Sequence, residues 1–141
     1  MILFDSSVVI DARDQDSPFH GWAKQQIANA VSADGAAVNT VAVSEASVRA
    51  KDRDAVPALL ESFGITLIPL PISAAVPAAK AFGVYLERLK KDGKTALNRV
   101  PLPDFLIGAH TEAEGMKLVT RDPDRVKTYF PAVSLILPPT M

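Results

Sequence analysis

The chain has 141 residues, of which 48% are hydrophobic, and its formal net charge at pH 7 is −1. This length and hydrophobic content predict one globular domain over residues 1–141. The near-zero charge argues against nonspecific nucleic-acid binding through bulk positive charge, and the lack of cysteine excludes disulfides, zinc–thiolate sites and iron–sulfur clusters.

The first half of the chain alternates short apolar runs with helical patterns. Strands are predicted at residues 2–4, 36–39 and 65–68, and helices at 6–10, 18–33, 41–50 and 54–62. Ser6 or Ser7 is a candidate N-cap for the first helix. In the helix over 18–33, the residues available for burial are Trp22, Ile27, Ala30 and Val31.

The second half continues the alternation. The longest predicted helix spans residues 73–91, with one apolar face formed by Ala75, Ala79, Phe82, Leu86 and Leu89. A loop is expected at 92–101, a helix from Pro103 to a cap at Gly115, a strand at 116–120, a short helix at 123–129 and a last strand at 133–137. This order predicts an α/β fold with a mostly parallel sheet and helices on both faces.

Acidic residues fall where such a sheet places its ligand sites, at the carboxyl ends of the strands. Asp5 follows the first strand, and Asp122 follows the fourth. Glu45 lies early in the helix after the second strand, and Asp104 lies in the first turn of its own helix. We therefore expect four carboxylates from separate parts of the chain at one edge of the sheet.

Each acid also has an ordinary structural explanation. Asp5 and Asp104 suit helix N-termini, Glu45 suits a solvated helix surface, and Asp122 suits a turn before Pro123. Their gathering at one edge would be unfavourable without a counter-ion. Carboxylate and hydroxyl oxygens without sulfur favour Mg²⁺ or Mn²⁺, and such ions support phosphodiester hydrolysis by activating water.

Three stretches of the chain, ILFDSSVVID, VSEAS and PDFLIGAHTEAEGMKLVTRDPDRVKTYFP, resemble the PIN-domain ribonucleases, and in particular the VapC-type toxins of bacterial toxin–antitoxin pairs. The resemblance implies a three-layer α/β/α sandwich with about four or five short strands. It also implies a metal-dependent endoribonuclease that is neutralised by a cognate antitoxin and commonly forms a homodimer. The antitoxin would be received by the region of residues 18–33 and 41–62.

The resemblance also assigns residues. Asp5, Asp104 and Asp122 match the acids that hold Mg²⁺ or Mn²⁺, and Glu45 matches the acid that binds a second ion or orients water. Ser7 and Thr120 match polar positions near the metal, and Asp124 matches a peripheral acid present in some members. His110 and His20 have no expected catalytic role, and a packing or surface position is favoured for His110.

Positive charge gathers late in the longest helix and beyond. Residues 80–99 hold six basic and two acidic side chains, a net of +4. This segment could follow an RNA backbone or could simply be a solvated helix end. The candidates for RNA contact are Arg49, Lys90, Lys91, Lys94, Arg99 and Arg121, and Arg121 and Arg125 could instead neutralise the acids.

Two other functions remain open from the residues. A phosphotransfer receiver domain would need a paired acidic motif early and a lysine at a late strand end, which Asp5-Ser6-Ser7 and Lys117 fit poorly. A catalytically inactive PIN-like module that binds RNA or a partner is also compatible with the sequence, although the four intact acids favour an active enzyme. No apolar run approaches the roughly 18 residues of a membrane span, and no signal peptide is recognisable. We therefore expect a cytoplasmic protein.

Overall fold

The computed structural model of the protein describes residues 1–94 and 101–140. Within them, parallel strands form one five-stranded sheet in the order β3-β2-β1-β4-β5. The strands are β1 (Ile2–Phe4), β2 (Ala36–Asn39), β3 (Thr66–Ile68), β4 (Lys117–Val119) and β5 (Ser134–Ile136). Helices cover the sheet to give three α/β/α layers, so the predicted fold class is confirmed, with a fully parallel sheet among the described strands.

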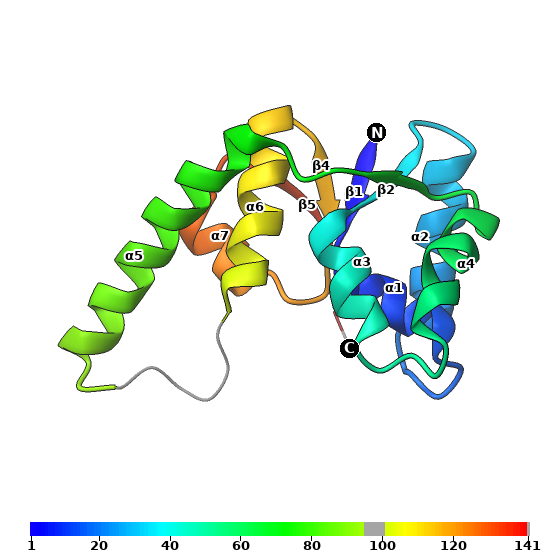
Figure 1. Cartoon of the computed structure of the whole chain (residues 1–141), viewed down its shortest axis with the longest axis horizontal. Coiled ribbons are helices and arrows are strands. Elements are labelled where there is room, and N and C mark those ends of the chain that lie inside the picture. Colours follow the sequence, from blue (N-terminus) through cyan, green and yellow to red (C-terminus); the bar gives the residue numbers. More distant parts are fainter. Residues whose placement is uncertain (95–100, 141) are drawn as a thin grey trace.

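The helices follow the strands in alternation (Figure 1). They are α1 (Ser6–Arg13), α2 (His20–Val31), α3 (Thr40–Ser47), α4 (Val56–Ser62), α5 (Ala75–Lys91), α6 (Leu102–Glu114) and α7 (Asp124–Tyr129). Short 3₁₀ turns, η1 (Arg53–Ala55) and η2 (Ile72–Ala74), precede α4 and α5. No helix in the described part of the chain is both long and apolar enough to span a bilayer.

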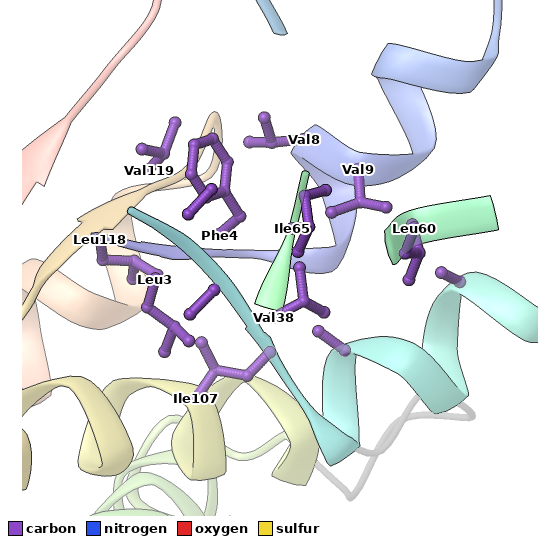
Figure 2. Packing of buried hydrophobic residues seen from close by; sticks show 14 of the residues in the cluster. Leu3, Phe4, Val8, Val9, Val38, Leu60, Ile65, Ile107, Leu118 and Val119 are labelled. Atoms are coloured by element: carbon purple, nitrogen blue, oxygen red, sulfur yellow. The ribbon is translucent and has the colours of Figure 1, made fainter. Parts of the chain in front are cut away.

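The core forms on both faces of the central strands, because successive strand residues point to opposite sides. Leu3 and Phe4 are both fully buried and pair in register with Leu118 and Val119. Figure 2 shows Leu3 with Leu118 on the side of Ile107 from α6, and Phe4 with Val119 on the side of α1. Both faces of β1 and β4 are therefore apolar, which leaves the strand ends for polar chemistry.

The strand order creates one position suited to a ligand site. The chain proceeds from β1 to β2 and β3 on one side, and then crosses to β4 and β5 on the other. The connections after β1 and β4 therefore lead away in opposite directions, and open α/β sheets bind ligands at such a switch point. The amide of Asp5 donates to the carbonyl of Val119 across 3.0 Å, which joins the two strand ends.

Several predicted helix ends need correction. The N-cap position of α1 is Asp5, without a side-chain capping bond, and Ser6 is already helical. The helix predicted from residue 18 begins at His20, and the one predicted to end at residue 50 ends at Ser47. Val31, predicted to be available for burial, is 40% exposed. The predicted loop at 92–101 lies largely outside the described residues.

The predicted apolar face of the longest helix is also wrong in part. Ala75, Ala79 and Leu86 are exposed, whereas Ala78 is buried and Phe82 and Tyr85 pack against the core. The contact face is rotated toward α6, because Phe82 and Tyr85 both lie against the ring of Phe105. Helical periodicity alone does not fix which face of this helix is buried. The packing of the aromatic cluster sets that face.

Two glycines of α6 have distinct structural reasons. Gly115 ends the helix in the left-handed conformation with φ of 63°, as predicted. Gly108 lies in mid-helix, where an added Cβ would come within 2.5 Å of Cδ2 of Phe130. This close approach fixes α6 against the residue that ends α7.

A buried polar pair joins the second strand to α6. The side chains of Asn39 and His110 are buried, and Asn39 Nδ2 lies 3.0 Å from His110 Nδ1. Asn39 Oδ1 caps α3 by accepting from the amide of Ala42, so its amide nitrogen donates to the histidine ring. Burial lowers the pKa of His110, with Glu114 opposing, which favours the neutral ring that can accept this bond. The packing role expected for His110 therefore holds.

Candidate active site

A cleft of about 1120 Å³ opens at the carboxyl edge of the sheet, beside the ends of β1 and β4. All four predicted acids, Asp5, Glu45, Asp104 and Asp122, line it. They arrive from different elements: Asp5 from the end of β1, Glu45 from α3 and Asp122 from beyond β4. Asp104 joins them because α6 runs back toward β4, so the start of α6 lies at the carboxyl edge.

Asp5 is held most firmly of the four. Its Oδ2 accepts a hydrogen bond from Thr120 Oγ1 at 2.8 Å, and Ser7 Oγ approaches the same oxygen at 3.4 Å. Burial raises the pKa of Asp5, the bond from Thr120 opposes this, and the charges of Asp104 and Asp122 raise it further. Burial and the neighbouring acids therefore disfavour the charged form of Asp5, and a bound cation would favour it.

Thr120 links the two acids that flank it in the site. It is fully buried, and besides donating to Asp5 its hydroxyl accepts from the amide of Asp122 at 3.1 Å. This bond fixes the turn after β4 and directs the following residues toward the cleft. Ser7, Asp122 and Asp124 line the cleft, whereas Thr120 supports it from behind.

Glu45 and Asp104 each have a partner that the sequence did not suggest. Ser6 Oγ donates to Glu45 Oε1 at 2.9 Å, which ties α3 to the start of α1. Arg125 Nη1 donates to Asp104 Oδ2 at 2.6 Å, and the guanidinium also lies 5.5 Å from the centroid of Tyr85. Arg125 is therefore a counter-charge for a site acid, one of the two uses that the sequence left open.

Arg121 has a different partner. Its Nε lies 3.0 Å from Oδ2 of Asp11, a buried acid on α1, while the guanidinium lies 5.2 Å from the centroid of Phe19. Sequence reasoning missed Asp11, although its position three residues after Val8 places it on the buried side of α1. An acid on a buried helix face is a signal that the fold supplies a cation for it.

The charges that line the cleft favour a bound cation. Among the described residues, six carboxylates and four arginines line it, a formal charge of −2. The acids are Asp5, Asp14, Glu45, Asp104, Asp122 and Asp124, and the arginines are Arg13, Arg49, Arg121 and Arg125. One divalent cation would bring this formal charge to zero, and the oxygen-only donor set fits Mg²⁺ or Mn²⁺.

The acids of the described residues nevertheless do not form a complete metal-coordination shell. In the described part of the chain, no three acidic or histidine side chains are arranged to hold a metal ion. One oxygen of Asp104, Oδ2, is directed to the guanidinium of Arg125. A metal ion that used this oxygen would compete with Arg125 for it.

The predicted RNA contacts divide into two groups. Arg49 and Arg121 line the cleft, whereas Lys90, Lys91 and Lys94 lie at and beyond the end of α5 and do not line it. Arg99 lies outside the described residues. His20 does not line the cleft either, and its Nδ1 lies 3.0 Å from the carbonyl oxygen of Asp11.

Comparison with known proteins gives a family match over most of the chain. The family model of the PIN domain matches residues 2–131. No curated protein gives a significant match.

Solved structures with a similar fold cover nearly the whole chain. VapBC2 from Rickettsia felis, bound to a DNA fragment from their promoter, has 17% identity and a TM-score of 0.62 over 97% of this chain and 98% of that one. DNA-bound VapBC from Salmonella typhimurium has 13% identity and a TM-score of 0.63, with 96% and 98% covered. VapC20 from Mycobacterium tuberculosis, a toxin that cleaves the sarcin–ricin loop, has 16% identity and a TM-score of 0.63, with 95% and 99% covered.

Proposed function

Because the chain belongs to the PIN domain family, we propose that it is a divalent-metal-dependent endoribonuclease acting as the toxin of a type II toxin–antitoxin pair. The observation that carries the proposal is the meeting of Asp5, Glu45, Asp104 and Asp122 in one cleft at the switch point of the sheet. These acids are separated by up to 117 positions in the sequence and come from four places in the fold: the junction of β1 and α1, helix α3, the first turn of α6 and the turn after β4.

The side chains divide the work as follows. Asp5, Asp104 and Asp122 would hold Mg²⁺ or Mn²⁺, directly or through water, and Thr120 keeps Asp5 in position through its 2.8 Å bond. Glu45 would hold a second ion or orient the attacking water, with Ser6 fixing one of its oxygens. A bound metal would supply a water of lowered pKa and would stabilise charge on the phosphate. Ser7 supports Asp5, and Asp124 stays peripheral.

An antitoxin protein is the expected partner. Two of the solved relatives above are VapBC structures, and this chain exposes apolar side chains in the region predicted to receive an antitoxin. Leu59 and Phe63 on and after α4 are 38% and 40% exposed, and Val31 at the end of α2 is 40% exposed. We expect co-expression with the antitoxin to suppress cleavage, and a homodimer to show a molar mass of two chains by light scattering.

A second candidate function is favoured by one specific contact. The ion pair of Arg125 with Asp104, in a cleft where the described acids form no finished metal group, suits an inactive PIN-like module that binds RNA or a partner. In such a module the arginine would permanently replace the metal. The two candidates differ in whether a divalent cation can displace Arg125 from Asp104.

RNA cleavage by the purified protein separates the candidates. We expect total cellular RNA to be cut in Mg²⁺ or Mn²⁺, with cleavage abolished by EDTA, by Asp5→Asn and by Asp104→Asn. Lys127→Asn is the matched control, because Lys127 is exposed on α7 and does not line the cleft. Equal cleavage by the wild type and both acid variants would overturn the site. Binding of RNA without cleavage in any divalent cation would favour the inactive module.

A further inference from the structure

One arginine of the cleft differs from the others in how it is held. Arg121 has two contacts with the protein. Its Nε lies 3.0 Å from Asp11 Oδ2, and its guanidinium lies over the ring of Phe19. The terminal nitrogens Nη1 and Nη2 donate no hydrogen bond to the described residues. About a third of the side chain is exposed, and the residue lines the cleft directly before Asp122.

Asp11 is the buried ion-pair partner of this arginine. Its side chain is only 5% exposed, and its other oxygen, Oδ1, accepts from Ser17 Oγ at 2.9 Å. A buried carboxylate is costly unless it is paired, so the ion pair with Arg121 maintains both groups in place. Asp11 does not itself line the cleft, and so it has no access to a bound ligand.

Two of the other three arginines of the cleft are engaged through a terminal nitrogen, whereas the third, Arg49, has no hydrogen bond or ion pair with the described residues that would fix it. Arg125 directs Nη1 to Asp104, and Arg13 directs Nη1 to the carbonyl of Ala46 at 3.4 Å. Each of these two uses a terminal nitrogen on the protein, whereas Arg121 uses only Nε. The contact at Nε is an ion pair without hydrogen-bond geometry, because Asp11 Oδ2 accepts no hydrogen bond. It leaves the two terminal nitrogens as a fork of N–H groups, the geometry that binds a phosphate by two parallel hydrogen bonds.

We propose that Arg121 is the phosphate-binding residue of the cleft and that Asp11 is its positioning residue, holding the fork toward the RNA backbone beside Asp122. The inference rests on the proposed function and names the contact that brings a phosphodiester to the acids. Fixing the fork in advance reduces the conformational entropy that a free arginine would lose on binding. Phe19 contributes by supporting the face of the guanidinium.

The test is binding of a short labelled single-stranded oligouridylate in Ca²⁺, measured by fluorescence anisotropy at several salt concentrations. We expect Arg121→Gln to weaken binding on the order of tenfold and to reduce the salt slope by about 0.7, the loss of one phosphate contact on a single strand. Arg121→Lys should restore the slope without restoring affinity, because lysine keeps the charge but has no fork. Lys127→Gln, which removes a charge outside the cleft, should leave both close to wild type.

A double-mutant cycle tests the role of Asp11. Asp11→Asn should weaken binding roughly two- to fivefold with the salt slope retained, and it should add nothing in the Arg121→Gln background, because it acts only through Arg121. Circular dichroism of each variant checks that the fold is kept. Normal affinity of Arg121→Gln, or an Asp11→Asn effect that persists without Arg121, would overturn the inference.

The outcomes distinguish this inference from the proposed function. Cleavage of RNA that is insensitive to Arg121 would retain the nuclease and reject the phosphate contact. Binding that depends on both Arg121 and Asp11, with no cleavage in any divalent cation, would retain the phosphate contact and reject the nuclease. Absence of RNA binding by the wild type would reject both.

Discussion

Arg125 donates from Nη1 to Oδ2 of Asp104 across 2.6 Å, so a cation of the chain itself occupies one of the two oxygens that Asp104 could offer to a metal. The two side chains are 41% and 38% exposed, which places the pair in partly solvated surroundings. Such a pair is worth only about 0.2–1 kcal/mol. A divalent cation that binds this oxygen therefore has to replace only a weak interaction.

Removing this competitor should strengthen metal binding. We expect Arg125→Gln to bind Mn²⁺ roughly two- to fivefold more tightly than the wild type, measured by isothermal titration. Arg88→Gln is the matched control, because Arg88 likewise lies over a tyrosine ring, that of Tyr129, but does not line the cleft. Unchanged or weaker Mn²⁺ binding by Arg125→Gln would show that the arginine does not oppose the metal.

The raised pKa of Asp5 predicts a stability effect with a definite sign. Folding favours the protonated form of this carboxyl, so its contribution is present below the ordinary value of 3.8 and is lost as the pH rises through the folded-state pKa. Ionisation of this carboxyl therefore costs more free energy in the folded state than in the unfolded state. Asp5→Asn should unfold at a higher temperature than the wild type at pH 7, and the difference should close as the pH falls.

Thermal unfolding across pH checks this sign, and Asp14→Asn is the control, because Asp14 is an exposed acid of the same cleft. Mg²⁺ should raise the melting temperature of the wild type and not that of Asp5→Asn, since the amide is a poorer metal ligand. A variant less stable than the wild type at pH 7 and equally stable in acid would contradict the assignment.

The buried Asn39–His110 bond predicts a loss of stability that a conservative change partly repairs. His110→Leu leaves Asn39 Nδ2 without its acceptor and should lower the free energy of unfolding by about 1–3 kcal/mol. His110→Asn places an amide oxygen near the position of Nδ1 and should recover part of that loss. Urea unfolding measures both, and equal destabilisation by the two variants would mean that ring packing, not the bond, matters.

Gly108 predicts a steric effect with an internal control. Gly108→Ala drives a Cβ toward the ring of Phe130 and should cost about 1–3 kcal/mol. Gly83→Ala, in mid-helix in α5 with nothing within 4 Å of the added Cβ, should instead stabilise by roughly 0.5–1 kcal/mol. Thermal or chemical unfolding gives the two signs, and destabilisation by both would point to a general intolerance of changes in these helices.

Much of the fold followed from local patterns. The strands at Ile2–Phe4 and Ala36–Asn39 have the predicted bounds, and Gly115 ends α6 as expected, because short apolar runs and a left-handed glycine are local signals. The errors fall where a choice depends on distant residues. The contact face of α5 was decided by the ring of Phe105, which lies 20 residues or more from the tyrosine and phenylalanine it meets.

The sequence by itself determined which acids could share a site. Parallel strands bring their carboxyl ends to one edge, so Asp5, Asp104 and Asp122 were predictable from their places relative to the strands. Only the tertiary structure decided their partners. Ser6 meets Glu45 from 39 positions away, and Thr120 meets Asp5 from 115.

The same holds for the arginines of the stretch LVTRDPDR. The sequence left open whether they neutralise the acids or contact the phosphate, and in the structure Arg121 pairs with Asp11 on α1 whereas Arg125 pairs with Asp104 on α6. Hydrophobic periodicity and turn residues act over a few positions, and they determine the local conformation of the backbone. The pairing of charges depends on which elements the sheet order brings together, and that is settled only when the chain has folded.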